Sequence, residues 1–390
     1  MRASQQGGRS RLAEFPARIP ADDRLARPRL NAAPAALRAI GWPHAGPPPE
    51  GAWADAMAAH PAARPARVVE QHRTGYLVAQ GPGEAVSVES LPQWQRPRCP
   101  PAERAAVGDW VLVEDGRIVA LLERHGVIKR AIAGEHYGQQ LIAANVDTVF
   151  VVCGLDADFN PKRIERYLLL VQGGGVGPVV VLTKADQAGT DADGARAALA
   201  ARLGDEVPVL AVNARDPGSA AALTPWLGPG RTAVLVGSSG AGKSTLTNAL
   251  LGVERMKTGE VRERDSRGRH TTTHRALIPL PSGACLIDTP GMRELKPTGE
   301  EDLSEGGFAD VEALTAQCRF SDCRHEGEPG CAVRAALDEG RLDPARYANY
   351  AKLRDEVAGA AGVLAARQAA KKPPGGRRPA PRNGGRPGRR

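Results

Sequence analysis

Between residues 66 and about 132 the chain alternates apolar and polar positions over short stretches. These stretches are separated by turn signals such as "GPG" and "EDG", and they include "RVVEQHRTGYLVAQ", "EAVSVES", "GDWVLVEDG" and "RIVALLER". Several short strands in so few residues predict a small β-barrel. We expect an OB-fold here. The alternatives are an SH3-like barrel, or a barrel with no role in nucleic-acid binding.

From about residue 146 the pattern changes to near-continuous apolar runs that alternate with amphipathic segments. Strands are predicted for "VDTVFVVCGL", "GPVVVLTKAD", "EVPVLAVNA", "RTAVLVG", "HRALIPL" and "ACLIDTPG", and helices for "NPKRIERYLLLVQ", "ADGARAALAARLG" and "GKSTLTNALLG". Asn160 is the expected N-cap of the first helix, with Pro161 at its first position. This alternation indicates an α/β domain with a parallel sheet covered on both faces.

After Met292 the chain is predicted to be mostly helical, over "DLSEGGFADVEALTAQ", "CAVRAALDEG" and "PARYANYAKLRDEVAGAAGVLAARQAA". The first 65 residues are rich in Ala, Pro and Arg and are expected to be disordered, although "LRAIGW" could form a short helix. The expected organisation is an extension (1–65), the barrel (66–133), the α/β domain (134–298), a helical domain (299–368) and a disordered basic tail (369–390).

The net charge of +8 comes from 52 Lys and Arg against 44 Asp and Glu. Eight of the basic residues, and no acidic ones, lie between residues 371 and 390, so the rest of the chain is balanced. A basic tail is typical of a nucleic-acid or ribosome partner, although a solvated tail without a partner has the same composition. No apolar run has the ~18 residues that span a membrane, and the N-terminus lacks a secretory signal, so we expect a cytoplasmic protein.

The stretch "GSSGAGKST" fits the phosphate-loop pattern G-x-x-x-x-G-K-[ST], with a strand before it and a helix after it. In such a loop, backbone N–H groups surround the phosphates, Lys243 bridges the β- and γ-phosphates, and Ser244 is a ligand of Mg²⁺. The expected nucleotide-binding residues of this loop are Gly237, Ser238, Ser239, Gly240, Ala241, Gly242, Lys243, Ser244 and Thr245.

A second motif, "TKAD" (Thr183, Lys184, Ala185 and Asp186), follows an apolar strand and predicts recognition of guanine. The Asp186 carboxylate is suited to accept hydrogen bonds from guanine N1–H and the 2-amino group, a donor pair that adenine lacks. Lys184 would pack over the base, and "VNA" would bring Asn213 and Ala214 to the guanine carbonyl. An ATPase or a small-molecule kinase is the alternative, against which Asp186 argues.

Further residues are candidates for magnesium binding and catalysis. In "LIDTPG", Asp288 would hold Mg²⁺ through a water, and the N–H of Gly291 would contact the γ-phosphate. In "GRHTTTH", Thr272 is the expected switch threonine and Thr271 its rival; His270 could assist catalysis or be only an exposed loop histidine. Met292 stands where many GTPases carry a water-orienting Gln, so slow intrinsic hydrolysis is expected.

The order of these motifs is unusual, because the base motif precedes the phosphate loop in the chain. Rotating the order restores that of an ordinary GTPase, so the chain is predicted to be circularly permuted. Such a permutation is tolerated where the joined termini lie close together at the surface. It places the segment after "DTPG" directly before the helical domain, so loss of the γ-phosphate would move that domain.

Cys318, Cys323, His325 and Cys331 follow the spacing C-x₄-C-x-H-x₅-C. Three thiolates and one imidazole make a closed tetrahedral site for one structural zinc ion, without catalysis; the alternative is a set of free thiols. The other three cysteines (Cys99, Cys153 and Cys285) lie in other contexts.

The permuted order, "GSSGAGKST", "GRHTTTH", "DTPGMREL", "IAANVDTVFVV" and the Cys/His cluster together resemble the ribosome small-subunit-dependent GTPase A family (RsgA, also called YjeQ) over about residues 66–360. The resemblance implies an OB-fold, a permuted GTPase domain and a zinc domain. It also implies late maturation of the small ribosomal subunit, with GTP hydrolysis stimulated by that subunit. This sequence departs from the family in its long ends and in Thr183, where Asn is commoner.

The leading hypothesis is therefore a GTP-driven assembly factor that contacts ribosomal RNA mostly through phosphate groups and acts as a monomer. The rival is a nucleotide-gated RNA-binding regulatory module whose hydrolysis is incidental.

Overall fold

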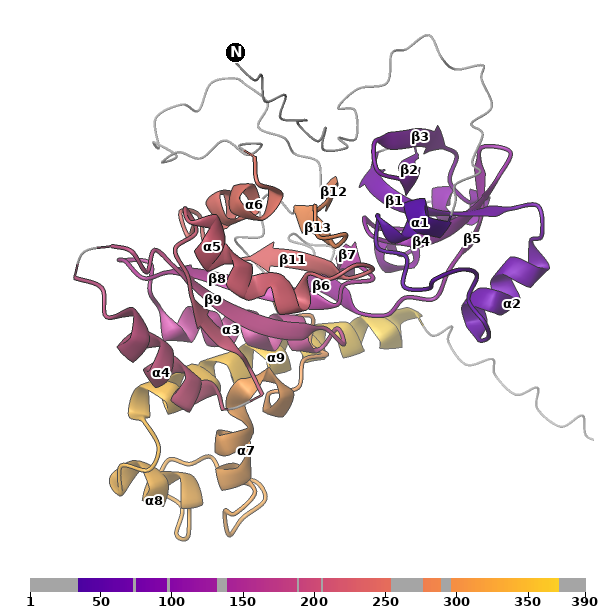
Figure 1. Cartoon of the computed structure of the whole chain (residues 1–390). Helices are drawn as coiled ribbons and strands as arrows, with labels where there is room; N and C mark the ends of the chain where they lie inside the picture. The colour runs from indigo at the N-terminus through magenta and orange to yellow at the C-terminus, as the bar shows by residue number, and fades with distance from the viewer. Residues whose placement is uncertain are drawn as a thin grey trace, which may run out of the picture.

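The computed structural model describes residues 34–72, 75–96, 99–131, 139–187, 189–204, 206–253, 276–288 and 296–371. Figure 1 shows a small barrel beside a central sheet with helices on both faces, and a helical domain beneath that sheet. The barrel, the α/β unit and the helical domain follow one another in the chain, as the hydropathy pattern predicted.

The barrel consists of five antiparallel strands in the order β3-β2-β1-β4-β5. An isolated parallel bridge between Glu89 and Arg117 joins the two outer strands, so the sheet closes on itself. The strands are β1 (Arg64–Gln71), β2 (Tyr76–Gly81), β3 (Glu84–Val88), β4 (Trp110–Glu114) and β5 (Arg117–Leu121), with 3₁₀ turns at Pro92–Gln95 and Pro101–Glu103.

Alternation along β4 shows why this segment forms a barrel strand. Val111 and Val113 face the barrel interior, whereas Trp110 and Leu112 face outward into a second core. Because side chains of a strand alternate between its faces, a strand with apolar residues at every position is buried on both sides. The outer face of the barrel must therefore be covered.

Residues 34–63 provide part of that cover, which differs from the disorder expected for this segment. They include the helices α1 (Pro34–Arg38) and α2 (Ala52–Ala59). Trp42 is 2% exposed, and its ring lies 4.7 Å from that of Trp110. The Ala- and Pro-rich composition suggested disorder, but a few large apolar side chains are enough to order the segment against a preformed surface. Residues 1–33 lie outside the described residues.

Arg67 of β1 lies where this segment, the barrel and the main sheet meet. Its guanidinium is fully buried and donates to the carbonyl of Ile40 at 2.6 Å and to Thr232 Oγ1 at 2.8 Å. It also donates to the carbonyls of Gly108 and Asn145. Burial lowers the pKa of Arg67 from its ordinary value. The four acceptors around the guanidinium, three carbonyls and one hydroxyl, satisfy its N–H donors.

A two-stranded hairpin, β6 (Val127–Ala131) and β7 (Gln139–Ala144), connects the barrel to the main sheet. The expected domain boundary between residues 133 and 134 lies within this hairpin. Because the two strands pair with each other, the hairpin is a single unit that belongs wholly to neither neighbour.

The main sheet has the strand order β10-β9-β8-β11-β13-β12. All neighbours are parallel except β12 and β13, which are antiparallel. The expectation of a wholly parallel sheet is wrong at this edge, because only a short turn joins these two strands and leaves no room for a crossover. The strands are β8 (Thr148–Gly154), β9 (Gly177–Thr183), β10 (Val209–Ala211), β11 (Thr232–Val236), β12 (Ala276–Pro279) and β13 (Cys285–Asp288).

Both faces of this sheet are buried. On β8, Val149 and Val151 join the core shared with α3 and α4, whereas Phe150 and Val152 join the core beneath α5 and α6. The helices are α3 (Pro161–Gln172), α4 (Ala192–Leu203), α5 (Pro217–Ala220) and α6 (Lys243–Leu251), with a 3₁₀ turn at Ala221–Trp226. The predicted N-cap of α3 is confirmed: the Asn160 side chain accepts a hydrogen bond from the N–H of Arg163.

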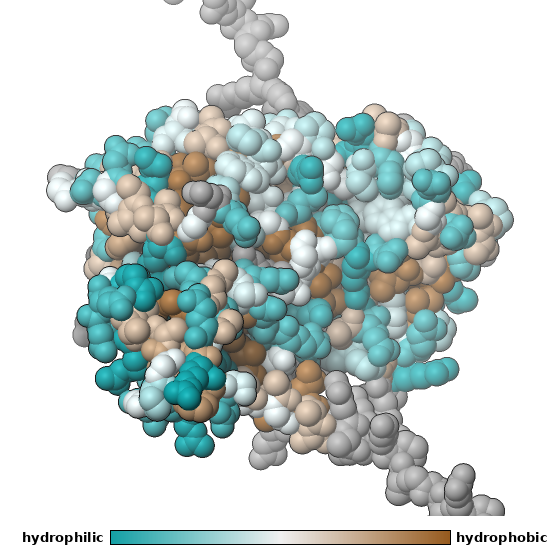
Figure 2. Space-filling view, turned by 90° about the horizontal axis from the view of Figure 1, so that it is seen from below, coloured by the Kyte–Doolittle hydropathy of each residue, from teal (hydrophilic) through white to brown (hydrophobic). Residues whose placement is uncertain are grey.

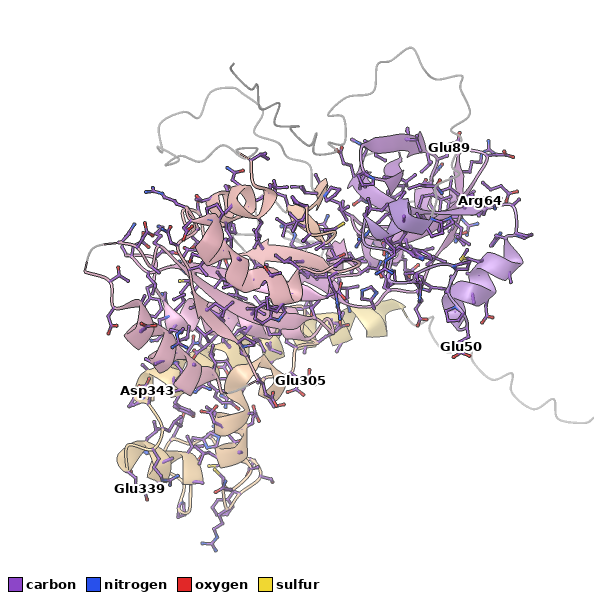
Figure 3. All side chains as sticks on the ribbon, viewed as in Figure 1. Glu50, Arg64, Glu89, Glu305, Glu339 and Asp343 are labelled. Atoms are coloured by element: carbon purple, nitrogen blue, oxygen red, sulfur yellow. The ribbon has the colours of Figure 1, made fainter. Side chains whose placement is uncertain are left out.

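The helical domain contains α7 (Ala309–Thr315), preceded by a π-turn at Ser304–Phe308, then α8 (Ala332–Asp338) and the long α9 (Pro344–Lys371). It joins the α/β unit through Glu165 of α3, which is fully buried. Glu165 accepts from Arg202, from Arg346 at 2.7 Å and from Asn349 at 2.6 Å. Asp343 extends the contact at the surface, where it meets Arg202 at 2.9 Å (Figure 3).

Seen from the side of the helical domain, much of the surface is hydrophilic, with smaller hydrophobic areas between (Figure 2). Within the described ranges, the exposed large hydrophobic side chains are Val253, Phe320 and Val363. None of the helices in this part of the chain is long and apolar enough to cross a membrane.

Candidate nucleotide site and metal centre

A pocket of about 930 Å³ opens at the carboxyl ends of the parallel strands. Ligands of open α/β sheets bind at this edge, where the loops after the strands converge. Most of the predicted nucleotide-binding residues meet there: Thr183, Lys184, Asp186, Asn213, Ala214, Ser239, Gly240, Gly242, Lys243, Ser244 and Thr245. The structure therefore brings the three separated motifs into one pocket.

The phosphate loop runs between β11 and α6 and depends on glycine at two points. Gly237 approaches β8 so closely that a Cβ would lie 2.1 Å from the carbonyl oxygen of Val152. Gly242 has φ 89° and caps the start of α6, a left-handed conformation that other residues adopt at a cost. The first N–H groups of α6 consequently point toward the pocket, where an anion can bind.

Lys243 lies at the first position of α6 and curls back over the loop. Its Nζ donates to the carbonyl of Gly237 at 2.8 Å and to the carbonyl of Ser238. These carbonyls hold the ammonium group beside the space that phosphates would fill. The Ser238 hydroxyl in turn donates to the Asp158 carboxylate at 2.5 Å, which fixes the loop against the segment after β8.

Thr183, the last residue of β9, reaches the same loop from the opposite side. It is fully buried, and its hydroxyl donates to the carbonyl of Ala241 at 2.6 Å. The hydroxyl is short enough to fit beside Gly242, where an added Cβ would lie 3.1 Å from Thr183 Oγ1. Thr183 therefore ties the base motif to the phosphate loop.

Sequence reasoning missed four polar residues of the pocket, namely Asp156, Gln187, Arg215 and Asn248. Asp156 follows the end of the buried strand β8 by two residues, and this position could have predicted that it lies at the pocket. Asn248 lies one helical turn after Ser244 on α6, and this i+4 spacing places both on one face. Arg215 follows Asn213 and Ala214 directly, and only the tertiary structure shows that it faces the pocket.

Other predicted site residues do not line the pocket. Ala185, Gly237, Ser238 and Ala241 are not among the residues that line it. Asp288 ends β13, as predicted, but is not part of the pocket lining in the described ranges. Thr271, Thr272, His270, Gly291 and Met292 lie outside the described residues.

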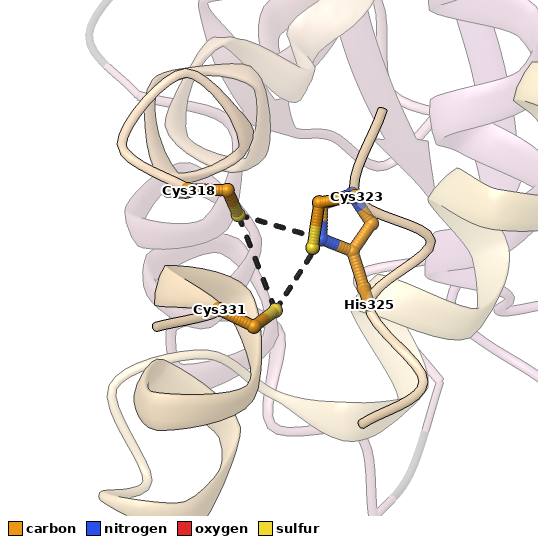
Figure 4. A group of neighbouring side chains, drawn as sticks. All are labelled: Cys318, Cys323, His325 and Cys331. Atoms are coloured by element: carbon orange, nitrogen blue, oxygen red, sulfur yellow. Dashed lines mark hydrogen bonds between the residues drawn. The ribbon is translucent and has the colours of Figure 1, made fainter. Parts of the chain in front are cut away.

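Cys318, Cys323, His325 and Cys331 converge between α7 and α8 (Figure 4). Their four candidate ligand atoms all lie within 4.8 Å of one another. His325 Nδ1 lies 3.5 Å from Sγ of Cys318 and 3.5 Å from Sγ of Cys331, and these two sulfur atoms are 4.0 Å apart.

These distances fit a tetrahedral zinc ion. Zn–S bonds of about 2.3 Å and Zn–N bonds of about 2.0 Å place neighbouring sulfur atoms about 3.8 Å apart, and a sulfur about 3.5 Å from a nitrogen. The N–H of Arg334 also donates to Cys331 Sγ at 3.4 Å, a contact that helps to orient this sulfur. The four predicted ligands thus form one cluster whose geometry and chemistry suit a metal ion.

The fold and the pocket define a class of protein. A phosphate loop between β11 and α6, facing a base motif that comes earlier in the chain, is the arrangement of a circularly permuted P-loop nucleotide-binding protein. A family model described as RsgA GTPase matches residues 121–298. Together with the relatives below, this match shows that the chain belongs to the RsgA GTPase family and is a GTP hydrolase.

Two relatives are described as small ribosomal subunit biogenesis GTPase RsgA. That of Xanthomonas axonopodis pv. citri is 73% identical over 333 residues, which cover 85% of this chain and 92% of the relative. That of Xanthomonas euvesicatoria pv. vesicatoria is 70% identical over 354 residues, covering 91% and 97%.

Two solved structures share the fold. YjeQ from Thermotoga maritima is 25% identical, with a TM-score of 0.54, over 76% of this chain and 99% of that one. YloQ, described as a circularly permuted GTPase, matches with a TM-score of 0.52 and 22% identity over 76% of this chain and 95% of its own. The predicted permutation is confirmed.

Proposed function

We propose that this protein hydrolyses GTP to GDP and phosphate while it acts, in the cytoplasm and as a monomer, as a late maturation factor of the small ribosomal subunit. It binds ribosomal RNA and leaves the subunit on hydrolysis. The observation that carries this proposal is the 73% identity, over nearly the whole length, to a protein named for biogenesis of the small ribosomal subunit.

The pocket supports specific roles for its residues. Lys243, whose ammonium group lies at the carbonyls of Gly237 and Ser238 in the phosphate loop, would bind the β- and γ-phosphates. Asp186 would bind the guanine edge. Thr272, Gly291 and His270 keep their predicted roles as switch, γ-phosphate contact and candidate catalytic group.

Two metal ions belong to the proposal. Ser244, Thr272 and Asp288 would hold Mg²⁺, which supplies neutralisation of phosphate charge when GTP is bound. Cys318, Cys323, His325 and Cys331 would hold one structural zinc ion with no open position.

The barrel is the proposed RNA-binding module. Its closed pairing β1-β2-β3-β5-β4-β1, with parallel contact between the end of β3 and β5, supports the OB-fold that the sequence predicted. Together with the helical domain and the basic residues 369–390, it would contact RNA through phosphate groups, so binding should weaken as salt rises. The domain limits given by the sequence serve as the working division of the chain, except that residues 34–63 belong with the barrel and the β6–β7 hairpin stays one unit.

The test is GTP hydrolysis by the purified protein, alone and with purified small or large ribosomal subunits. We expect a slow basal rate, because Met292 cannot orient water. The proposed role predicts strong stimulation by small subunits and none by large ones. Equal rates in all three reactions would contradict the ribosomal role. ATP as a competitor should leave the rate unchanged, whereas competition by ATP would support the alternative of an ATPase or kinase.

The rival, a regulatory module with incidental hydrolysis, is tested with Lys243→Ala. In the proposed function this variant fails to support subunit maturation, because the phosphates lose their principal cation. Normal maturation with the variant would favour the rival. The exposed Lys352→Ala on α9 is the matched control, since it removes the same charge far from the pocket.

A further inference from the structure

We propose that Asp156 is a positioning residue for guanine recognition: it holds the ammonium group of Lys184 and thereby keeps the carboxylate of Asp186 free to accept from the base. The inference deepens the proposed function and rests on the assignment of Lys184 and Asp186 to the guanine ring.

The pocket contains two carboxylates and one lysine that lies between them in the sequence. Asp156 and Asp186 both line it, and so does Lys184. The Lys184 Nζ pairs with Asp156 Oδ2, and both side chains are partly exposed, 25% for Lys184 and 30% for Asp156. The carboxylate of Asp186, which is exposed, has no hydrogen-bond or ion-pair partner among the residues that the structure describes. The lysine is therefore committed to one carboxylate and leaves the other available.

The space for this ion pair is provided by Gly154. A Cβ at this position would lie 2.7 Å from Asp156 Oδ1, 3.1 Å from Lys184 Nζ and 3.2 Å from Lys184 Cε. Gly154 ends β8 opposite Thr183 of β9, so the two strands deliver Asp156 and Lys184 to the same point. The N–H of Leu155 also donates to the carbonyl of Thr183 at 2.9 Å, which fixes the two loops relative to each other.

Further contacts hold both partners of the ion pair in place. The N–H of Asp158 donates to Asp156 Oδ1 at 3.1 Å, so one carboxylate oxygen is fixed by the backbone while the other faces Lys184. Lys184 has a positive φ of 63°, a conformation that is costly for a residue with a Cβ and that is found where surrounding contacts enforce it. Burial opposes the charge of Asp156, but its hydrogen bonds outweigh this, and its pKa lies below the ordinary value. The Asp156 carboxylate is thus ionised at neutral pH.

The alternative partner of Lys184 is Asp186, and this explains why the ion pair with Asp156 matters for guanine binding. A lysine one residue from the end of β9 and an aspartate two residues later can pair with each other across the same loop. If they did, the Asp186 carboxylate would have to release an ammonium group before it accepted the two guanine donors. Asp156 removes that cost and leaves the methylene stem of Lys184 to cover the base.

The experiment compares Asp156→Asn with the wild-type chain by calorimetric titration of GDP and of inosine diphosphate, which lacks the 2-amino group. Asn keeps the acceptor for the Asp158 N–H but loses the charge. We expect GDP to bind about tenfold more weakly, as for a lost hydrogen bond between charged groups, and the preference for GDP over inosine diphosphate to shrink. The KM for GTP should rise by the same factor while kcat at saturating GTP stays within about twofold, because Asp156 contacts the base-binding lysine and not the phosphate loop.

Asp193→Asn is the matched control, since Asp193 is an exposed carboxylate of the same unit on α4 and lies outside the pocket. The inference is overturned if Asp156→Asn binds both nucleotides as this control does. Thermal unfolding of both nucleotide-free variants checks that the fold is intact.

A double variant separates positioning from a general structural effect. In a Lys184→Ala background, Asp156→Asn should have no further effect on GDP affinity, because there is no ammonium group left to hold. Fully additive losses would overturn the inference. Asp186→Asn tests the underlying assignment by itself: unchanged GDP affinity in that variant would show that the base site is elsewhere, whatever Asp156 does.

Discussion

Thr183 shows how a single hydroxyl connects two motifs that are far apart in the chain. Asn is commoner at this position, and its side chain is longer. Here the shorter threonine is buried, donates to the carbonyl of Ala241 and leaves room for the tight turn at Gly242. The departure from the usual residue therefore preserves the contact between the base motif and the phosphate loop, rather than removing it.

Replacing Thr183 with Val should weaken nucleotide binding. Valine has the same shape but cannot donate, and a buried hydrogen bond contributes about 1 kcal/mol, which corresponds to about fivefold in the affinity for GDP. The measurement is GDP titration of Thr183→Val against Thr183→Ser, which retains the hydroxyl. Equal affinities of the two variants would show that the hydroxyl does not hold the loop.

At the scale of secondary-structure elements, the Cys/His cluster joins the end of α7 to the start of α8. The chain between these helices contains few apolar residues, so the four ligands rather than a hydrophobic core fix its path. In small units of this kind, binding of the metal supplies the folding free energy.

Cys323→Ser should therefore reduce the bound zinc from one ion per chain to a small fraction. The segment between α7 and α8 should become sensitive to protease, because Ser is a poor zinc ligand. The GDP affinity should stay unchanged, since the pocket lies on another unit. Metal analysis and limited proteolysis provide the readout. Cys99→Ser, outside the cluster, is the control; loss of zinc in that variant as well would argue against the assigned ligands.

At the scale of the whole molecule, the segment 34–63 unites the barrel with the α/β unit. The carbonyl of Ile40 in this segment accepts a hydrogen bond from Arg67, which also donates to Thr232 Oγ1 of the main sheet. Trp42 packs against Trp110 of the barrel within a core that continues into the α/β unit. The barrel is thus anchored by three contacts from distant parts of the chain.

Trp42→Ala should lower the free energy of unfolding by about 3–5 kcal/mol, because it removes a large, fully buried side chain. Urea denaturation followed by circular dichroism measures the change. Val363→Ala on the exposed face of α9 should alter it by less than about 0.5 kcal/mol. A comparable effect of both substitutions would show that the segment 34–63 is not part of the cooperative core.

The sequence by itself determined the order of the units, the strand and helix types, the phosphate loop and the ligand set of the metal cluster. These features follow from local periodicity or from short motifs with fixed spacing, such as the apolar run of β8 or the cap at Asn160. Local pattern is sufficient there because each residue acts through near neighbours in the chain.

Only the tertiary structure decided what depends on contacts between distant segments. Examples are the strand order around β8, the folding of the segment around Trp42, the burial of Arg67 and the pairing of Asp156 with Lys184. A composition rich in Ala and Pro predicts disorder when it is considered alone, but the free energy of burying two or three aromatic rings against another surface outweighs the loss of chain entropy. Such surfaces exist only once the chain has folded.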